Sequence, residues 1–310
     1  MRSFHTRIII LGAALLAAAS FAHAELRVVA TLSDIGWIAE RVGGDRVEVT
    51  VLCPGHQDPH YLPAKPSLSR KLGKADLLLY NGLELEVGWL PVLIDHARNG
   101  DIRPGGRGEL DCSAAVEEIL EKPEGKVDRS QGDIHPLGNP HYLLDPRNGA
   151  AVGGLIAERL AELDPEGAEE YRARAAEWAA EVERSIPLWK DKAAAAPACP
   201  IIVYHQHWEY LFHWLGLESI GSIEHRPGIN PSPQHVEKII ERGRSRENVF
   251  LVAATWDNRK IADKAAERIG APMAVLPGAV GAVDEAPGYP ELFETICARL
   301  GAAAPVVGTR

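Results

Sequence analysis

Short apolar runs alternate with helical patterns along this chain of 310 residues, and the alternation limits the possible folds more than any other feature. Strand-like runs, rich in β-branched residues and leucine, lie at 27–31, 47–52, 77–80, 201–204, 250–253 and 273–276. Helical patterns lie at 35–42, 67–74, 88–98, 114–120, 148–163, 208–215, 234–242 and 260–269. Continuous apolar runs are typical of strands buried on both faces. The sequence therefore predicts an α/β protein with two domains and mainly parallel sheets.

A long helix is predicted between the two groups of strands. Asp164 and Pro165 are an N-cap acid and a first-turn proline, and apolar residues then recur at every third or fourth position. At about 1.5 Å per residue, a helix from 165 to about 192 is about 40 Å long, enough to run along both domains. We interpret residues 164–196 as a helix that bridges an N-terminal lobe at 25–163 and a C-terminal lobe at 197–310. Packing of this helix on one domain alone is the alternative.

The first 24 residues have the pattern of a secretory signal peptide. Arg2 and Arg7 precede an apolar core, and Ala22-His23-Ala24 supplies the small residues of a cleavage site. The apolar core is too short to span a bilayer, so we expect no insertion into the membrane. No cysteine follows the cleavage site, so the sequence predicts a periplasmic protein without a lipid anchor.

The charge of the chain argues against nucleic acid as a partner. Lys and Arg number 33 against 43 Asp and Glu, which gives a formal net charge of -10 at pH 7. We find no basic patch that would attract nucleic acid or an anionic membrane surface. The composition is that of a folded, acidic protein.

Four cysteines fall two in each half of the chain. Disulfides are the expected state of cysteines in an oxidising compartment, and three pairings of four cysteines are possible. If each half is a separate domain, the simplest pairing is Cys53 with Cys112 and Cys199 with Cys297. The absence of a C-x-x-C motif gives little support to a zinc cluster made of cysteines.

Three histidines occupy positions where open α/β sheets bind ligands, beyond the carboxyl ends of strands. His60 follows the run 47–52 through a turn-rich loop, His205 comes directly after the run 201–204, and His141 lies at the junction between the domains. Three imidazoles with a carboxylate or water make a tetrahedral site that suits zinc. His207 is the nearest rival to His205.

The motifs around these histidines resemble a family, the zinc and manganese receptor proteins of bacterial ABC importers, known as cluster A-I solute-binding proteins. The matches are D-P-H with P-S at 58–67, A-D-L with N-G at 75–82, N-P-H with L-D-P at 139–146, Y-H at 204–205, and P-S-P at 231–233. Together they run in the family's order along nearly all of the mature chain. The resemblance implies two lobes, each with a four-stranded parallel sheet, bridged by one long rigid helix.

The same resemblance implies that His60, His141 and His205 bind the metal in the cleft between the lobes. The family commonly supplies a fourth ligand from an aspartate after the last strand, but Pro277 occupies that place here. We expect the fourth ligand to be Asp284, with Glu285 or a water molecule as alternatives. The family's histidine-rich loop is reduced to residues 133–136, which leaves little room for a second metal site.

The expected cargo is Zn(II), because manganese-type members of the family usually have a glutamate at the position of His205. The expected partners are a membrane permease of an ABC importer and a periplasmic metallochaperone, and we expect a monomer. A manganese receptor, a zinc hydrolase with three histidines and a water, and an adhesin on the same fold remain alternatives. Neither H-E-x-x-H nor G-x-S-x-G is present, so we expect no enzyme.

Overall fold

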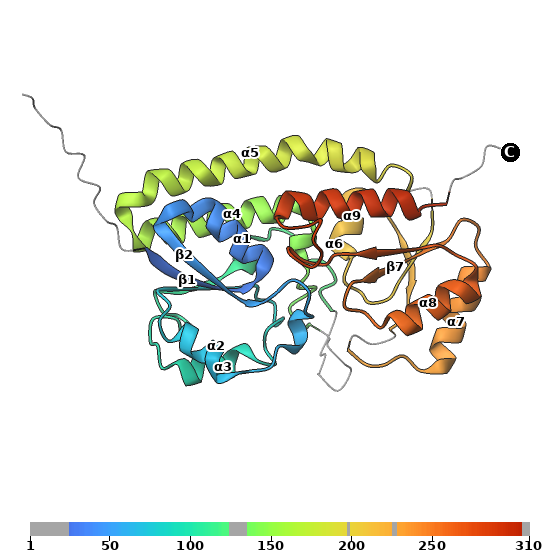
Figure 1. Ribbon diagram of the computed structural model, residues 1–310, viewed down its shortest axis with the longest axis horizontal. Coiled ribbons are helices and arrows are strands. Elements are labelled where there is room, and N and C mark those ends of the chain that lie inside the picture. The colour runs from blue at the N-terminus through green and yellow to red at the C-terminus, as the bar shows by residue number, and fades with distance from the viewer. Residues whose placement is uncertain (1–24, 124–134, 197–198, 225–227, 306–310) are drawn as a thin grey trace, which may run out of the picture.

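The computed structural model describes residues 25–123, 135–196, 199–224 and 228–305. The predicted signal peptide at 1–24 lies outside these residues, as do residues 133 and 134 of the short segment at 133–136. Figure 1 shows two α/β lobes side by side, with a long helix running along both.

Each lobe is built on a four-stranded parallel sheet. The first sheet has the order β2-β1-β3-β4, with strands Leu26–Leu32 (β1), Val47–Cys53 (β2), Leu77–Tyr80 (β3) and Glu109–Asp111 (β4). The second has the order β6-β5-β7-β8, with strands Ile201–Val203 (β5), Ser219–Ser222 (β6), Phe250–Ala254 (β7) and Met273–Leu276 (β8). The predicted architecture of two mainly parallel sheets is confirmed.

Helices cover both faces of the sheets, as the apolar strands require. Their bounds are Ser33–Gly43 (α1), Pro66–Leu72 (α2), Leu90–Ala97 (α3), Pro146–Leu163 (α4), Ala168–Lys192 (α5), Glu209–Leu215 (α6), Pro233–Arg244 (α7), Arg259–Ile269 (α8) and Tyr289–Ala303 (α9). Within the described part of the chain, we find no helix long and apolar enough to cross a membrane.

The long helix α5 has 25 residues and packs against both lobes. It contacts α1 and α4 of the N-terminal lobe and α9 of the C-terminal lobe (Figure 1). Its buried side chains form the apolar stripe expected from the sequence, at Tyr171, Ala175, Trp178, Val182 and Trp189. The bridging helix is therefore confirmed, while the lobe limits at 163 and 197 stay predictions.

The start of α5 differs from the expectation. Pro165–Gly167 forms a separate turn of 3-10 helix (η6), and α5 begins one residue later. The carboxylate of Asp164 accepts hydrogen bonds from Arg46 Nε at 2.7 Å and from the Tyr171 hydroxyl at 2.6 Å. Asp164 thus ties the start of the long helix to the segment before β2.

Some elements are not apparent from the sequence pattern. The helix expected at 114–120 is wrong, because only a 3-10 turn at Cys112–Ala115 (η3) forms there. The sequence analysis also missed the edge strands β4 and β6 and the helix α9. The edge strands are three and four residues long and lack a continuous apolar run, so they carry little sequence signal.

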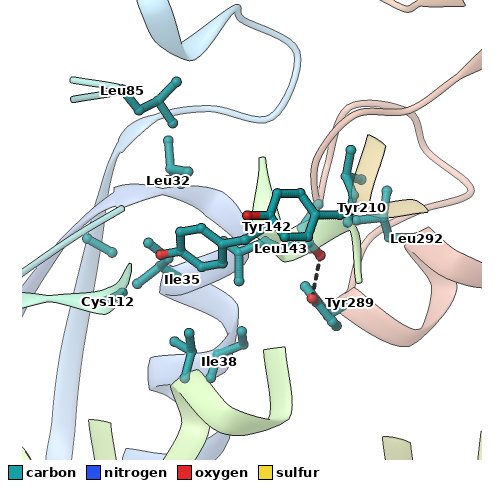
Figure 2. Packing of buried hydrophobic residues seen from close by; sticks show 14 of the residues in the cluster. Leu32, Ile35, Ile38, Leu85, Cys112, Tyr142, Leu143, Tyr210, Tyr289 and Leu292 are labelled. Atoms are coloured by element: carbon teal, nitrogen blue, oxygen red, sulfur yellow. Dashed lines mark hydrogen bonds between the residues drawn. The ribbon is translucent and has the colours of Figure 1, made fainter. Parts of the chain in front are cut away.

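One hydrophobic core extends through both lobes. It includes Leu78 of β3, Val203 of β5 and Phe293 of α9, all buried. At the junction, the Tyr289 hydroxyl donates to the Leu143 carbonyl at 2.5 Å, and Trp214 Nε1 donates to the Leu144 carbonyl at 3.0 Å. Figure 2 shows the first of these bonds within the packed aromatic and aliphatic side chains. The lobes are therefore held together by packing and by hydrogen bonds as well as by α5.

The expected disulfides are wrong, because all four cysteines are free and buried. Cys53 ends β2 and Cys112 follows β4, and these strands are the two opposite edges of the first sheet. Three strand spacings separate such edges by about 14 Å, twice the Cα separation of about 7 Å that a disulfide can span. In the second lobe, Cys199 lies beside the carbonyls of Ala195 and Pro305 instead of beside Cys297.

We therefore expect four reactive thiols when the protein is denatured without reductant and titrated with a chromogenic disulfide reagent. In the native protein, the reaction should be slow, because burial raises the pKa values of Cys53 and Cys297 to about 12. A count of two or zero thiols in denaturant would show that disulfides form after all.

Candidate metal centre

Three loops at the carboxyl ends of strands bring His60, His141 and His205 to one place. His60 lies in a 3-10 turn, Pro59–Tyr61 (η2), which follows β2. His141 directly precedes a second 3-10 turn, Tyr142–Leu144 (η5), and His205 follows β5. The ligand nitrogens of these three histidines all lie within 4.8 Å of one another. The structure thus brings together the three histidines that the sequence analysis selected.

The three rings are arranged around a common point. The ring centroids of His60 lie 5.2 Å from His141 and 5.9 Å from His205, and the remaining pair is 6.0 Å apart. Ligand nitrogens in a tetrahedral zinc site lie about 3.3 Å apart, because each Zn–N bond is about 2.0–2.1 Å. The separations between the nitrogens therefore need to shorten by at most about 1.5 Å to suit an ion of this size.

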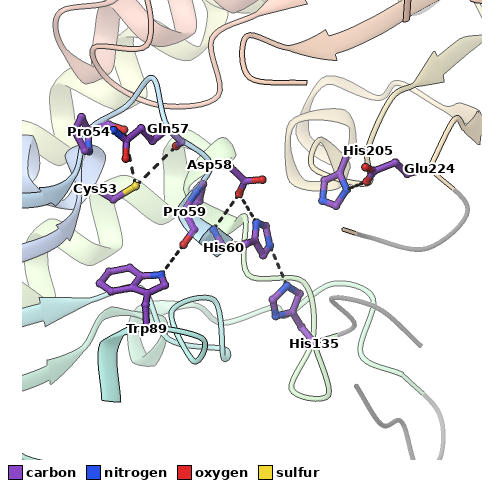
Figure 3. A network of polar contacts seen from close by, with 10 residues as sticks. All are labelled: Cys53, Pro54, Gln57, Asp58, Pro59, His60, Trp89, His135, His205 and Glu224. Carbon is purple, nitrogen blue, oxygen red and sulfur yellow. Dashed lines mark hydrogen bonds and ion pairs between the residues drawn. The ribbon is translucent and has the colours of Figure 1, made fainter. Parts of the chain in front are cut away.

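Carboxylates orient two of the rings. His60 Nδ1 lies 2.7 Å from Asp58 Oδ1, and His205 Nδ1 lies 2.7 Å from Glu224 Oε2, as Figure 3 shows. Asp58 also caps η2 by accepting from the His60 backbone N–H at 2.9 Å. A carboxylate that accepts from Nδ1–H leaves the lone pair of Nε2 free for a metal. These pairs leave Nε2 of both histidines available to a metal.

A buried network positions the backbone around His141. Asn139 Oδ1 accepts from the His141 backbone N–H at 2.9 Å, and Asn81 Nδ2 donates to the Pro140 carbonyl at 2.9 Å. Glu86 in turn accepts from the Asn81 backbone N–H at 2.6 Å, and burial raises the pKa of Glu86 to about 7. The sequence analysis noted the N-G motif at 81–82 without its role, which is to fix the loop that presents His141.

Burial and neighbouring charges set the protonation of the ligands. Burial, followed by the neighbouring imidazoles, lowers the pKa of His141 well below its usual value, so this ring is neutral and ready to bind metal. Burial opposes protonation of His205 too, but the hydrogen bond and charge of Glu224 outweigh it and raise the pKa of His205. A proton at His205 would therefore compete with a metal for this ring.

His207 is buried and packs against the ring of His141. Its ring centroid lies 4.1 Å from that of His141 and 4.8 Å from that of Trp208, and its side chain is buried. Burial and the neighbouring histidines lower the pKa of His207 to about 3, so it packs as a neutral ring. It lies outside the group of His60, His141 and His205, and its packing limits how the His141 ring can turn.

The structure does not bring Asp284 into the group of histidines. Asp284 is exposed, and backbone bonds from Ala286 to the Val283 carbonyl and from Gly281 to the Ala286 carbonyl close its loop on itself. Glu285, the alternative, is exposed and lies 3.5 Å from Arg299. Within the described residues, the group of possible ligand atoms therefore does not include Asp284 or Glu285, and their role as a fourth ligand stays a prediction.

Two titratable side chains beside the site were not selected from the sequence. His135 Nε2 lies 3.2 Å from His60 Nε2, and its ring centroid lies 6.4 Å from that of His141. Asp257, beyond β7, accepts from the Ala254 backbone N–H at 2.7 Å, and burial raises its pKa to about 7. The sequence signal was available for both, because His135 lies shortly before His141 and Asp257 shortly after a predicted strand.

The fold and the histidine group define a class of protein, a two-lobed binding protein with a candidate metal site at the junction of its lobes. Residues 28–303 match the family model described as "Zinc-uptake complex component A periplasmic", and the chain belongs to this family. The family consists of solute-binding proteins and not of enzymes, which excludes the hydrolase alternative.

Curated relatives and solved structures agree with this assignment. The chain is 27% identical over 241 residues to the manganese ABC transporter substrate-binding lipoprotein PsaA of Streptococcus pneumoniae, covering 76% of this chain and 74% of that protein. A crystal structure of ZnuA has a TM-score of 0.75 at 24% identity and covers 91% of this chain and 100% of its own. A periplasmic metal-binding protein from Candidatus Liberibacter asiaticus has a TM-score of 0.72 at 23% identity, covering 90% and 99%.

The pair of His205 and Glu224 predicts a pH dependence of metal binding. Below its raised pKa, His205 is a cation that must lose a proton before it can bind metal. Metal affinity should therefore fall as pH drops, beginning above the usual histidine pKa of about 6.5. In Glu224→Gln, which removes the raising charge, the fall should begin at lower pH. Competition titrations between about pH 8 and 5 measure this.

The exposed Glu241 on α7 provides a matched control, and Glu241→Gln should keep the wild-type pH profile. Identical profiles for the wild type and Glu224→Gln would contradict the assigned role of Glu224.

Proposed function

We propose that this protein captures Zn(II) with His60, His141 and His205 and delivers it to the permease of an ABC importer. The observation that carries the proposal is the convergence of three imidazoles within 4.8 Å, two of them oriented by carboxylates through Nδ1. Such carboxylate–histidine pairs are typical of metal ligands, because they fix the ring and raise its basicity.

The donor set favours zinc over manganese. Imidazole nitrogen suits Zn(II), whereas Mn(II) prefers the oxygens of carboxylates and water. In the described part of the chain, the group of possible ligand atoms within 4.8 Å consists of histidines alone. Zn(II) also binds nitrogen ligands more tightly than Mn(II) does in general.

Manganese is the second candidate, because several curated relatives are named as manganese transport proteins. The manganese ABC transporter lipoprotein of Streptococcus gordonii, for example, is 30% identical over 189 residues. Equilibrium dialysis against equal concentrations of Zn(II) and Mn(II), followed by elemental analysis, distinguishes the two cargoes. Retention of manganese instead of zinc would refute the proposed cargo.

We propose that the protein binds and delivers the metal in the periplasm. The family description names this compartment, and the pattern at 1–24 is that of a secretory signal peptide. A monomer that docks on the permease, and that receives zinc from a periplasmic metallochaperone, is part of the proposal. Because α5 and the shared core tie the lobes together, we expect only small lobe movements when metal binds. Crystal structures with and without zinc test this point.

Replacement of any of the three histidines by alanine should weaken zinc binding by at least about 100-fold, more than the effect of a typical outer-sphere change. Chelator competition measures the dissociation constants. His213→Ala, an exposed histidine on α6, should bind like the wild type. If His205→Ala kept wild-type affinity while His207→Ala lost it, the assignment of His205 would be wrong.

His205→Glu should shift the metal preference. A carboxylate in place of imidazole is a harder ligand, so zinc affinity should fall while manganese binding is retained or improved. The same dialysis experiment reads out the ratio of the two metals. An unchanged ratio would show that the identity of the ligand at 205 does not set selectivity.

A further inference from the structure

We propose that His135 is the fourth ligand, so that the metal is held by four imidazoles, His60, His135, His141 and His205. The inference rests on the proposed zinc-binding function and deepens it. It replaces the carboxylate that the sequence analysis expected with a nitrogen donor from the segment that also presents His141.

The distance between His135 and His60 fits one edge of a zinc tetrahedron. Their Nε2 atoms are 3.2 Å apart, and two nitrogens bonded to one tetrahedral Zn(II) lie about 3.3 Å apart. Figure 3 shows both rings pointing these nitrogens at each other. Little movement of this pair is therefore needed for both nitrogens to bind one ion.

Backbone hydrogen bonds and a glycine turn fix the position of His135 relative to His141. The Gly138 backbone N–H donates to the His135 carbonyl at 3.0 Å, and the Asn139 N–H donates to the Leu120 carbonyl at 2.8 Å. Gly138 has a φ of +113°, and a Cβ there would lie 2.2 Å from Ile119 Cγ2, so only glycine fits this turn. His135 and His141 are thus presented by one anchored segment.

The hydrogen atoms between the rings can be assigned. In the neutral tautomer of His60 that donates Nδ1–H to Asp58, Nε2 is an acceptor, and His135 Nε2–H is then the donor. When metal binds, the proton on His135 Nε2 passes to water and Nδ1 takes up a proton from water, so the ring changes tautomer, stays neutral and releases no net proton. Its Nε2 lone pair then replaces the hydrogen bond with a bond to the metal.

Charge balance also favours a neutral fourth ligand. Asp58 and Glu224, each 2.7 Å from a ligand ring, carry two negative charges that offset the two positive charges of Zn(II). A ligating carboxylate would add a further negative charge to a site that already has the carboxyl groups of Asp58, Glu224 and Asp257 beside it. Asp284 would also have to leave its closed, exposed loop.

X-ray absorption spectroscopy of the zinc-loaded full chain tests the proposal, because the number of imidazoles can be fitted. We expect four in the wild type and three with one oxygen ligand in His135→Ala. Zinc affinity of His135→Ala should fall at least about 10-fold. His56→Ala, an exposed histidine in the loop that carries His60, should keep four imidazoles and wild-type affinity. Equal melting temperatures of the metal-free variants exclude a folding defect.

Other results separate the two proposals. Three imidazoles with an oxygen in the wild type, and loss of that oxygen in Asp284→Ala, would overturn the role of His135 and leave the zinc receptor intact. Wild-type affinity in His135→Ala would also overturn it. Failure of the wild type to bind zinc would instead refute the proposed function itself.

Discussion

The candidate metal site depends on a fixed junction between two lobes, because His60, His141 and His205 come from separate loops that no local structure connects. Helix α5 packs along both lobes, and one apolar core extends beneath it from β3 to α9. Hydrogen bonds from Tyr289 and Trp214 to the η5 turn then hold the segment after His141. Close-packed protein interiors resist small displacements, so we expect the loops to keep their relative positions without a bound metal.

Within that frame, carboxylates and amides set the chemistry of each ring. Asp58 and Glu224 fix the orientation of His60 and His205, while Asn81 and Asn139 fix the backbone around His141. The outcome is a set of rings with unequal protonation, since burial keeps His141 neutral and Glu224 favours the charged form of His205. A receptor needs this combination, because the ligands must be preorganised and the ion must still be released.

Most of the fold could be predicted because its strands are buried on both faces and read as continuous apolar runs. The elements that were missed have a physical reason. Edge strands β4 and β6 bury fewer side chains, so their composition is not distinctive. The disulfide prediction failed because the pairing of Cys53 with Cys112 assumed proximity within a lobe, and the strand order places them at opposite edges.

The sequence by itself determined the alternation of strands and helices, the amphipathic stripe of α5 and the three histidines beyond strand ends. Each of these follows from local periodicity or from the rule that parallel sheets bind ligands at their carboxyl ends. Only the tertiary structure decided three further points. Asp284 is exposed, the ring of His207 packs against that of His141, and Nε2 of His135 lies within hydrogen-bond distance of Nε2 of His60. Such contacts depend on how loops fold against one another, and residue spacing along the chain does not encode that packing.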